Sequence, residues 1–116
     1  MTPKAFASGL MRGVVDENVS IYRDLFSQTS AADASDPYWK RALALFGSLT
    51  DEQRTIFFEI VRQVSIDTVS NILGVLDGVN PIDEGEATFT LISGNGQKIN
   101  GDLQSFFLIE DEATPR

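Results

Sequence analysis

The fold is decided by residues 50–79, TDEQRTIFFEIVRQVSIDTVSNILGVLDGV. This stretch contains no proline, and Thr50 with Gln53 matches the capping box, in which each residue satisfies a free amide of the other. Gly78 suits the left-handed position that ends many helices. We therefore predict one helix, about 40 Å long at about 1.5 Å per residue, around which the rest of the chain packs.

The predicted helix changes character near Ser65. Its first half has a narrow apolar stripe at helical spacing, which we expect to face the core. The stripe consists of Phe57, Ile60, Val61 and Val64. Beyond Ser65, apolar side chains cover about half of the circumference, so the second half is predicted to be more deeply buried and to have more apolar surface than one neighbour can cover.

The N-terminal part of the chain also has helical spacing. Residues 3–29 predict either one bent helix or two helices, with the break between Gly13 and Asp16. Asp36 and Pro37 then have the pattern of an N-cap followed by a proline in the first turn, which predicts a further helix.

The C-terminal part predicts a small β element. Alternation in residues 87–92 and the reversal signal of residues 94–96 indicate a β-hairpin over about 87–99. From Leu103 the spacing suits a short final helix, although the apolar run 106–109 fits a strand as well. The expected fold is mainly α (α+β): a single domain, residues 1–116, with a small helical bundle around the long central helix.

Composition and charge narrow the classes of function. The chain has 116 residues, no cysteine and a net charge of −8, and residues 67–116 carry nine acidic against two basic side chains. This acidic half argues against nucleic acid as a partner, because phosphate binding needs clustered Lys and Arg. No apolar run is long enough to span a bilayer, so we expect a cytoplasmic protein without a membrane partner.

The available chemistry argues against an enzyme. The chain has no histidine and no cysteine, so it lacks the usual base near neutral pH and the usual soft metal ligands. Asp67 and Asp77 lie about 15 Å apart along a helix, which is too far for paired-carboxylate hydrolysis. We therefore expect no catalytic residues, no metal and no cofactor.

Two sets of residues are candidates for binding. The first is a polar and acidic interaction surface beside and after the second half of the long helix. It consists of Asp67, Ser70, Asn71, Asp77, Asp83, Glu84 and Glu86. The second is an anion or peptide site at Trp39, Arg41 and Arg54. The alternative interpretation is that the small polar residues allow close helix packing and that the tryptophan anchors the core.

Four short motifs resemble those of a family of small uncharacterised bacterial proteins. They are Tyr22-Arg23-Asp24-Leu25-Phe26, Asp36-Pro37-Tyr38-Trp39, Leu76-Asp77-Gly78 and Asn100-Gly101-Asp102-Leu103-Gln104. The resemblance implies a bacterial protein that is mainly helical with a small β element, and it implies no activity. The small, acidic, cysteine-free composition also resembles that of bacterial immunity proteins.

These observations favour a non-enzymatic interaction protein that associates with itself, most simply as a homodimer, because the hairpin edge and the second half of the long helix both need covering. One alternative is an immunity-type protein whose acidic C-terminal half binds a basic toxin. A further alternative is a small enzyme or ligand-binding protein that uses Asp67 and Asn71.

Overall fold

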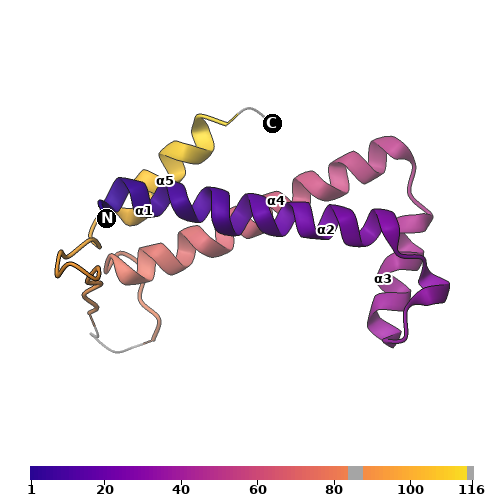
Figure 1. Cartoon of the computed structure of the whole chain (residues 1–116), viewed down its shortest axis with the longest axis horizontal. Coiled ribbons are helices and arrows are strands. Elements are labelled where there is room, and N and C mark those ends of the chain that lie inside the picture. Colours follow the sequence, from indigo (N-terminus) through magenta and orange to yellow (C-terminus); the bar gives the residue numbers. More distant parts are fainter. Residues whose placement is uncertain (84–87, 115–116) are drawn as a thin grey trace.

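The computed structural model describes residues 1–83 and 88–114, and it is built from helices (Figure 1). The α-helices are α1 (Pro3–Leu10), α2 (Glu17–Gln28), α3 (Pro37–Gly47), α4 (Asp51–Leu76) and α5 (Leu103–Glu112). A π-helical segment, Met11–Asp16, joins α1 to α2, and a 3₁₀ turn, Ala31–Asp33, precedes α3. Within the described ranges, no helix is both long enough and apolar enough to cross a membrane.

The N-terminal residues form one continuous helical rod, with the π-helical segment at the predicted break. The buried residues of its first half recur every fourth position, at Ala7, Met11 and Val15. In a pure α-helix, with 3.6 residues per turn, such a row winds around the axis. A π-turn holds more residues, because its hydrogen bonds span five residues instead of four. The segment therefore keeps every fourth residue closer to the same side of the rod. All three side chains therefore pack in one cluster with α4 and α5.

Helix α4 confirms the predicted central helix, although it ends at Leu76. The Thr50 hydroxyl accepts a hydrogen bond from the Gln53 amide at 3.2 Å, and the Thr50 amide donates to Gln53 Oε1 at 2.9 Å. Gly78 has a φ of 79° just beyond the helix. Both ends of α4 are thus defined by the local signals that predicted them.

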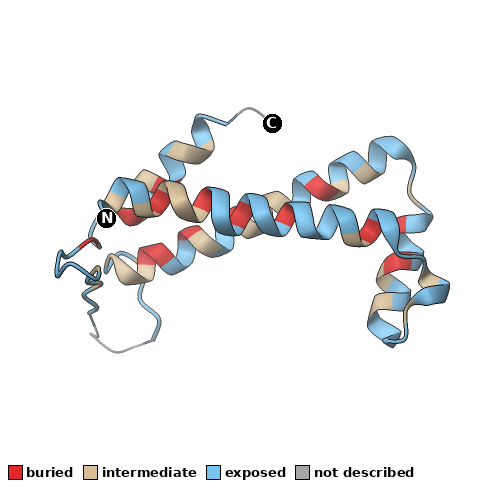
Figure 2. Ribbon diagram, viewed as in Figure 1, coloured by how far each residue is buried: buried red, intermediate tan, exposed pale blue. Residues whose placement is uncertain are grey.

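The hydrophobic core is divided into two clusters. The first joins α1, the π-helical segment, the second half of α4 and α5, and its buried members are Ala7, Met11, Val15, Ile66, Leu73, Leu103 and Phe107. The second joins the end of α2, α3 and the start of α4, and its buried members are Phe26, Leu43, Phe46 and Phe58. Between them the middle turns of α2 are exposed (Figure 2). The molecule is accordingly elongated, with extents of 49 × 33 × 24 Å.

The predicted C-terminal β-hairpin, about residues 87–99, is wrong. Its described part, residues 88–99, contains no strand and only one isolated antiparallel bridge, between Ile92 and Lys98. The side chain of Asn100 donates to the Phe89 carbonyl at 2.7 Å and accepts from the Leu91 amide at 2.8 Å. Because a side chain occupies these backbone groups, the pairing does not extend, and two strands alone are only marginally stable.

Helix α5 confirms the short final helix predicted from Leu103, and it includes the run 106–109, which fits a strand as well. Leu103 and Phe107 are one turn apart on this helix, and both are fully buried in the first cluster. Helix α5 packs against both α1 and α4 at the end of the molecule that holds the N-terminus (Figure 1). The C-terminal segment therefore completes the first core cluster as a helix.

Candidate functional site

A groove between α2 and α4, in the middle of the molecule, is the main candidate for an interaction site. It has a volume of about 430 Å³, and it is lined by Asn18, Tyr22, Ile60, Val61, Val64 and Ser65. We call it the α2–α4 groove. Helix α3 lies at one end of the α2–α4 pair and α5 at the other (Figure 1). The groove lies between the two core clusters, where neither of these helices covers it.

Three large apolar side chains in the α2–α4 groove are exposed. Tyr22 is 40% exposed, Ile60 is 58% exposed and Val64 is 59% exposed. The prediction that Ile60 and Val64 face the core is wrong, because the buried side of the first half of α4 lies at Phe58 instead. Phe58 packs in the second cluster with residues of α2 and α3, and Phe57 packs against the same cluster, so that Ile60 and Val64 of the predicted stripe are left toward solvent.

The aromatic ring of Tyr22 is held in place beside the groove. Its centroid lies 6.2 Å from that of Phe26 and 6.2 Å from that of Trp39, the latter in an edge-on arrangement. A tyrosine supported in this way loses little side-chain entropy when a partner packs on it. Such residues are typical anchors of protein interfaces.

Part of the predicted polar surface on α4 is used in packing within the chain. Ser70 is buried, and the side-chain amide of Gln104 donates to its carbonyl at 3.0 Å and to its hydroxyl at 3.2 Å. Asp67 is exposed and accepts a hydrogen bond from Gln63 at 2.9 Å. Ser70 therefore helps to attach α5 to α4, in agreement with the interpretation that small polar residues here permit close packing.

Asp77 has a structural role that the sequence did not reveal. One carboxylate oxygen accepts from the amides of Gly101, at 2.6 Å, and Leu103, at 3.1 Å, and the other accepts from the amide of Gln104, at 2.8 Å. The side chain of Asp102, which occupies the N-cap position of α5, makes no capping hydrogen bond. Asp77 therefore caps α5 from the end of α4.

The other members of the predicted surface do not form one described site. The main-chain carbonyl of Asn71 accepts a hydrogen bond of 3.5 Å from Asn80, and Asp83 lies in the segment after α4. Glu84 and Glu86 lie outside the described residues. Binding of a basic partner by this set stays a prediction.

The second predicted set is divided between different surroundings. Trp39 packs against Phe26, with ring centroids 6.0 Å apart, and Arg41 is exposed on α3. The guanidinium of Arg54 instead lies 4.7 Å above the ring of Phe46, at a separate cavity that it shares with Arg23. Sequence reasoning missed Arg23, because no local pattern links a residue in the middle of α2 to the first turns of α4.

No protein-family model, curated protein or solved structure matches the chain. The resemblance to a family of small bacterial proteins therefore stays a prediction. In residues 1–83 and 88–114, no three Asp or Glu side chains are grouped so that they could hold a metal ion. The α2–α4 groove is consequently the feature on which a function can be proposed.

Proposed function

We propose that this protein is a non-enzymatic interaction protein that associates with a second copy of itself through the α2–α4 groove. The observation that carries this proposal is the accessible apolar surface of Tyr22, Ile60 and Val64 between the two core clusters. Removing such surface from water is favourable, at about 25 cal/mol for each Å² buried.

The accessible surface of the chain is large enough to contribute to an interface with a second copy. It amounts to 7802 Å², whereas a compact protein of this mass has about 6,200 Å². The radius of gyration is 17.6 Å, against about 13 Å for a compact domain of this length. The excess area exceeds the roughly 800 Å² that each partner contributes to a standard interface.

The arrangement of the helices favours a second copy as the occupant of the groove. In the middle of the molecule, α2 and α4 lie against each other without a third helix over the groove (Figure 1). A twofold axis would place the same pair of helices from the partner on this face, so that four helices surround a common apolar centre. Because both surfaces are identical and mostly apolar, they are complementary in chemistry.

Sedimentation velocity between about 5 and 500 µM tests the proposal. We expect a dimer, and we expect Val64→Asp to raise its dissociation constant at least about tenfold, because the interface would bury an unpaired charge. Leu45→Asp on α3 is the matched control, since Leu45 is also 59% exposed but lies outside the groove. A monomer at all concentrations, or equal weakening by both substitutions, would contradict the proposal.

A further inference from the structure

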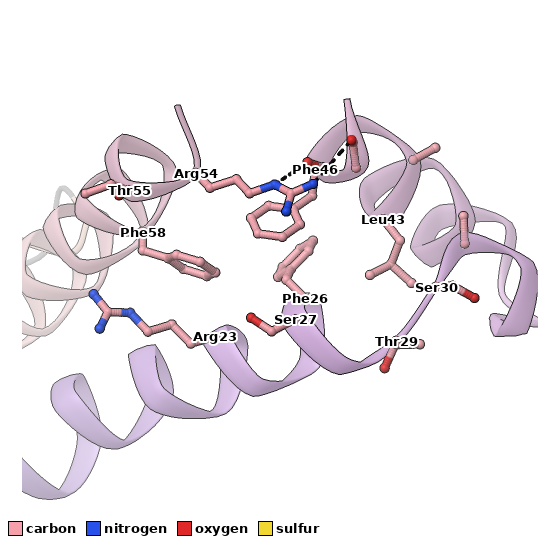
Figure 3. Close-up of a pocket in the computed structure, with 13 residues that line it drawn as sticks. Arg23, Phe26, Ser27, Thr29, Ser30, Leu43, Phe46, Arg54, Thr55 and Phe58 are labelled. Atoms are coloured by element: carbon pink, nitrogen blue, oxygen red, sulfur yellow. Dashed lines mark hydrogen bonds between the residues drawn. The ribbon is translucent and has the colours of Figure 1, made fainter. Parts of the chain in front are cut away.

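A second cavity lies at the other end of α2, where this helix meets α3 and the first turns of α4 (Figure 3). Its volume of about 740 Å³ is within the range of small-molecule sites, which is roughly 300–1,000 Å³. It shares no lining residue with the α2–α4 groove. Substitutions can therefore be made in this cavity without changing a lining residue of the groove.

Three phenylalanine rings form the apolar part of the cavity. The centroid of Phe26 lies 5.1 Å from that of Phe46 and 6.4 Å from that of Phe58, and the last two are 5.5 Å apart. All three residues are buried in the second core cluster. Their separations are those at which aromatic rings attract one another, and all three residues line the cavity.

Two arginines lie on opposite sides of these rings (Figure 3). The guanidinium carbon of Arg23 is 5.4 Å from the ring centroid of Phe58, and that of Arg54 is 4.7 Å from the ring centroid of Phe46. Arg54 also donates to the carbonyls of Phe46, at 3.2 Å, and Gly47, at 3.3 Å. These bonds orient its guanidinium, which has five N–H donors, and leave donors for a ligand.

The charged residues among the described lining of this cavity are both arginines, although the chain as a whole is acidic. The net charge is −8, yet among the described residues that line the cavity there is no Asp or Glu. In the described ranges the ion pairs are those of Arg62 with Asp16 and Asp111, in another part of the molecule. The guanidinium groups of Arg23 and Arg54 thus present positive charge beside an apolar wall.

Hydroxyl groups complete the polar lining. They belong to Ser27, Thr29, Ser30 and Thr55. The Ser30 hydroxyl already donates to the Asp33 carboxylate at 2.9 Å, and the Thr55 hydroxyl donates to the Asp51 carbonyl at 3.2 Å. Hydroxyls donate hydrogen bonds to carboxylate oxygens, and guanidinium groups bind carboxylates with two parallel N–H bonds. The lining therefore combines an apolar surface for a flat ring with donors for an anionic group on the arginines, Ser27 and Thr29.

We propose that this cavity binds a small aromatic carboxylate, with the carboxylate at Arg23, the positive charge of Arg54 on the other side of the rings, and the ligand's ring against Phe26, Phe46 and Phe58. The aromatic wall provides binding surface, and the arginines distinguish the anion from a neutral molecule of the same shape. Because the cavity and the α2–α4 groove have no residue in common, this proposal stands independently of self-association.

Naphthalene-2-carboxylate is a suitable probe, and naphthalene-2-carboxamide is the neutral control of the same shape. In titrations followed by amide chemical shifts, we expect the carboxylate to bind at least about tenfold more tightly than the carboxamide. Its largest shifts are expected at Ser27, Ser30 and Gly47. Equal affinity for the two probes, or shifts confined to the α2–α4 groove, would overturn the proposal.

Substitutions in the cavity test where the carboxylate probe binds. Arg23→Gln should weaken binding of the carboxylate at least about tenfold, whereas Arg12→Gln, which removes an exposed arginine outside the cavity, should leave it unchanged. Ala44→Trp fills the cavity from an exposed position on its wall and keeps both arginines, so it should abolish binding in a chain whose circular dichroism is unchanged. Unchanged affinity in Arg23→Gln and Ala44→Trp would contradict the site.

Discussion

A single side chain, Asp77, connects two parts of the chain that are far apart in sequence. Its carboxylate accepts hydrogen bonds from the backbone amides of Gly101, Leu103 and Gln104, at and just before the start of α5. The first amides of a helix have no partner within the helix, and the helix dipole makes this end favourable for a negative charge. Asp77 therefore both satisfies the start of α5 and holds it at the end of α4.

Replacing this carboxylate tests its contribution to stability. We expect Asp77→Ala to lower the free energy of unfolding by about 1–2 kcal/mol, because the amides at the start of α5 lose their acceptor. Urea denaturation followed by circular dichroism measures the change. The control is Asp67→Ala on the same helix, where the side chain is exposed and we expect a change below about 0.5 kcal/mol. Equal effects would show that Asp77 is not a cap.

At the scale of the element, two glycines inside helices have opposite environments. A Cβ on Gly9 in α1 would meet nothing within 4 Å. A Cβ on Gly74 in α4 would lie 2.2 Å from Asn80 Nδ2 and 2.9 Å from Gln104 Nε2. Gly74 is therefore required for the close approach of these side chains, whereas Gly9 only weakens its helix.

The same substitution should thus change stability in opposite directions. We expect Gly9→Ala to raise the free energy of unfolding by about 0.5–1 kcal/mol through higher helix propensity. Gly74→Ala should lower it by about 1–2 kcal/mol, because displaced Gln104 would leave the buried Ser70 without its hydrogen bonds. Urea denaturation of both variants measures the two effects, and a stabilising Gly74→Ala would contradict the close packing.

At the scale of the whole molecule, the two core clusters lie along a long pair of helices with an open middle. Helix α5 completes one cluster and α3 the other, and the α2–α4 groove lies between them. A chain with this arrangement has a larger surface relative to its volume than a compact domain of the same mass. Association of two copies would cover the apolar part of that surface.

Thermal unfolding should consequently depend on protein concentration. For a dimer that dissociates on unfolding, we expect the midpoint to rise by about 5 °C over a hundredfold increase in concentration. Differential scanning calorimetry on the intact chain measures this rise. In Val64→Asp the rise should be smaller, because less of the chain is dimeric at each concentration. A wild-type midpoint that does not change with concentration would contradict association through the groove.

The pattern of residues predicted the helical elements well and the C-terminal segment poorly. Local capping by Thr50 and Gln53 is encoded within one turn, so the start of α4 was predictable. The hairpin was predicted from alternation and a turn signal, but Asn100 takes the backbone groups that a second strand would need. Such competition depends on contacts that a local pattern does not contain.

The sequence by itself determined where α3 and α4 begin and where α4 ends, because caps, prolines and glycines act over a few residues. It also determined the acidic charge and the absence of histidine and cysteine. Only the tertiary structure decided which apolar face of α4 is buried, and which arginines share a cavity. Those properties depend on where α2, α3 and α5 pack along α4, since a helix presents apolar residues on more than one side and its neighbours select which side is covered.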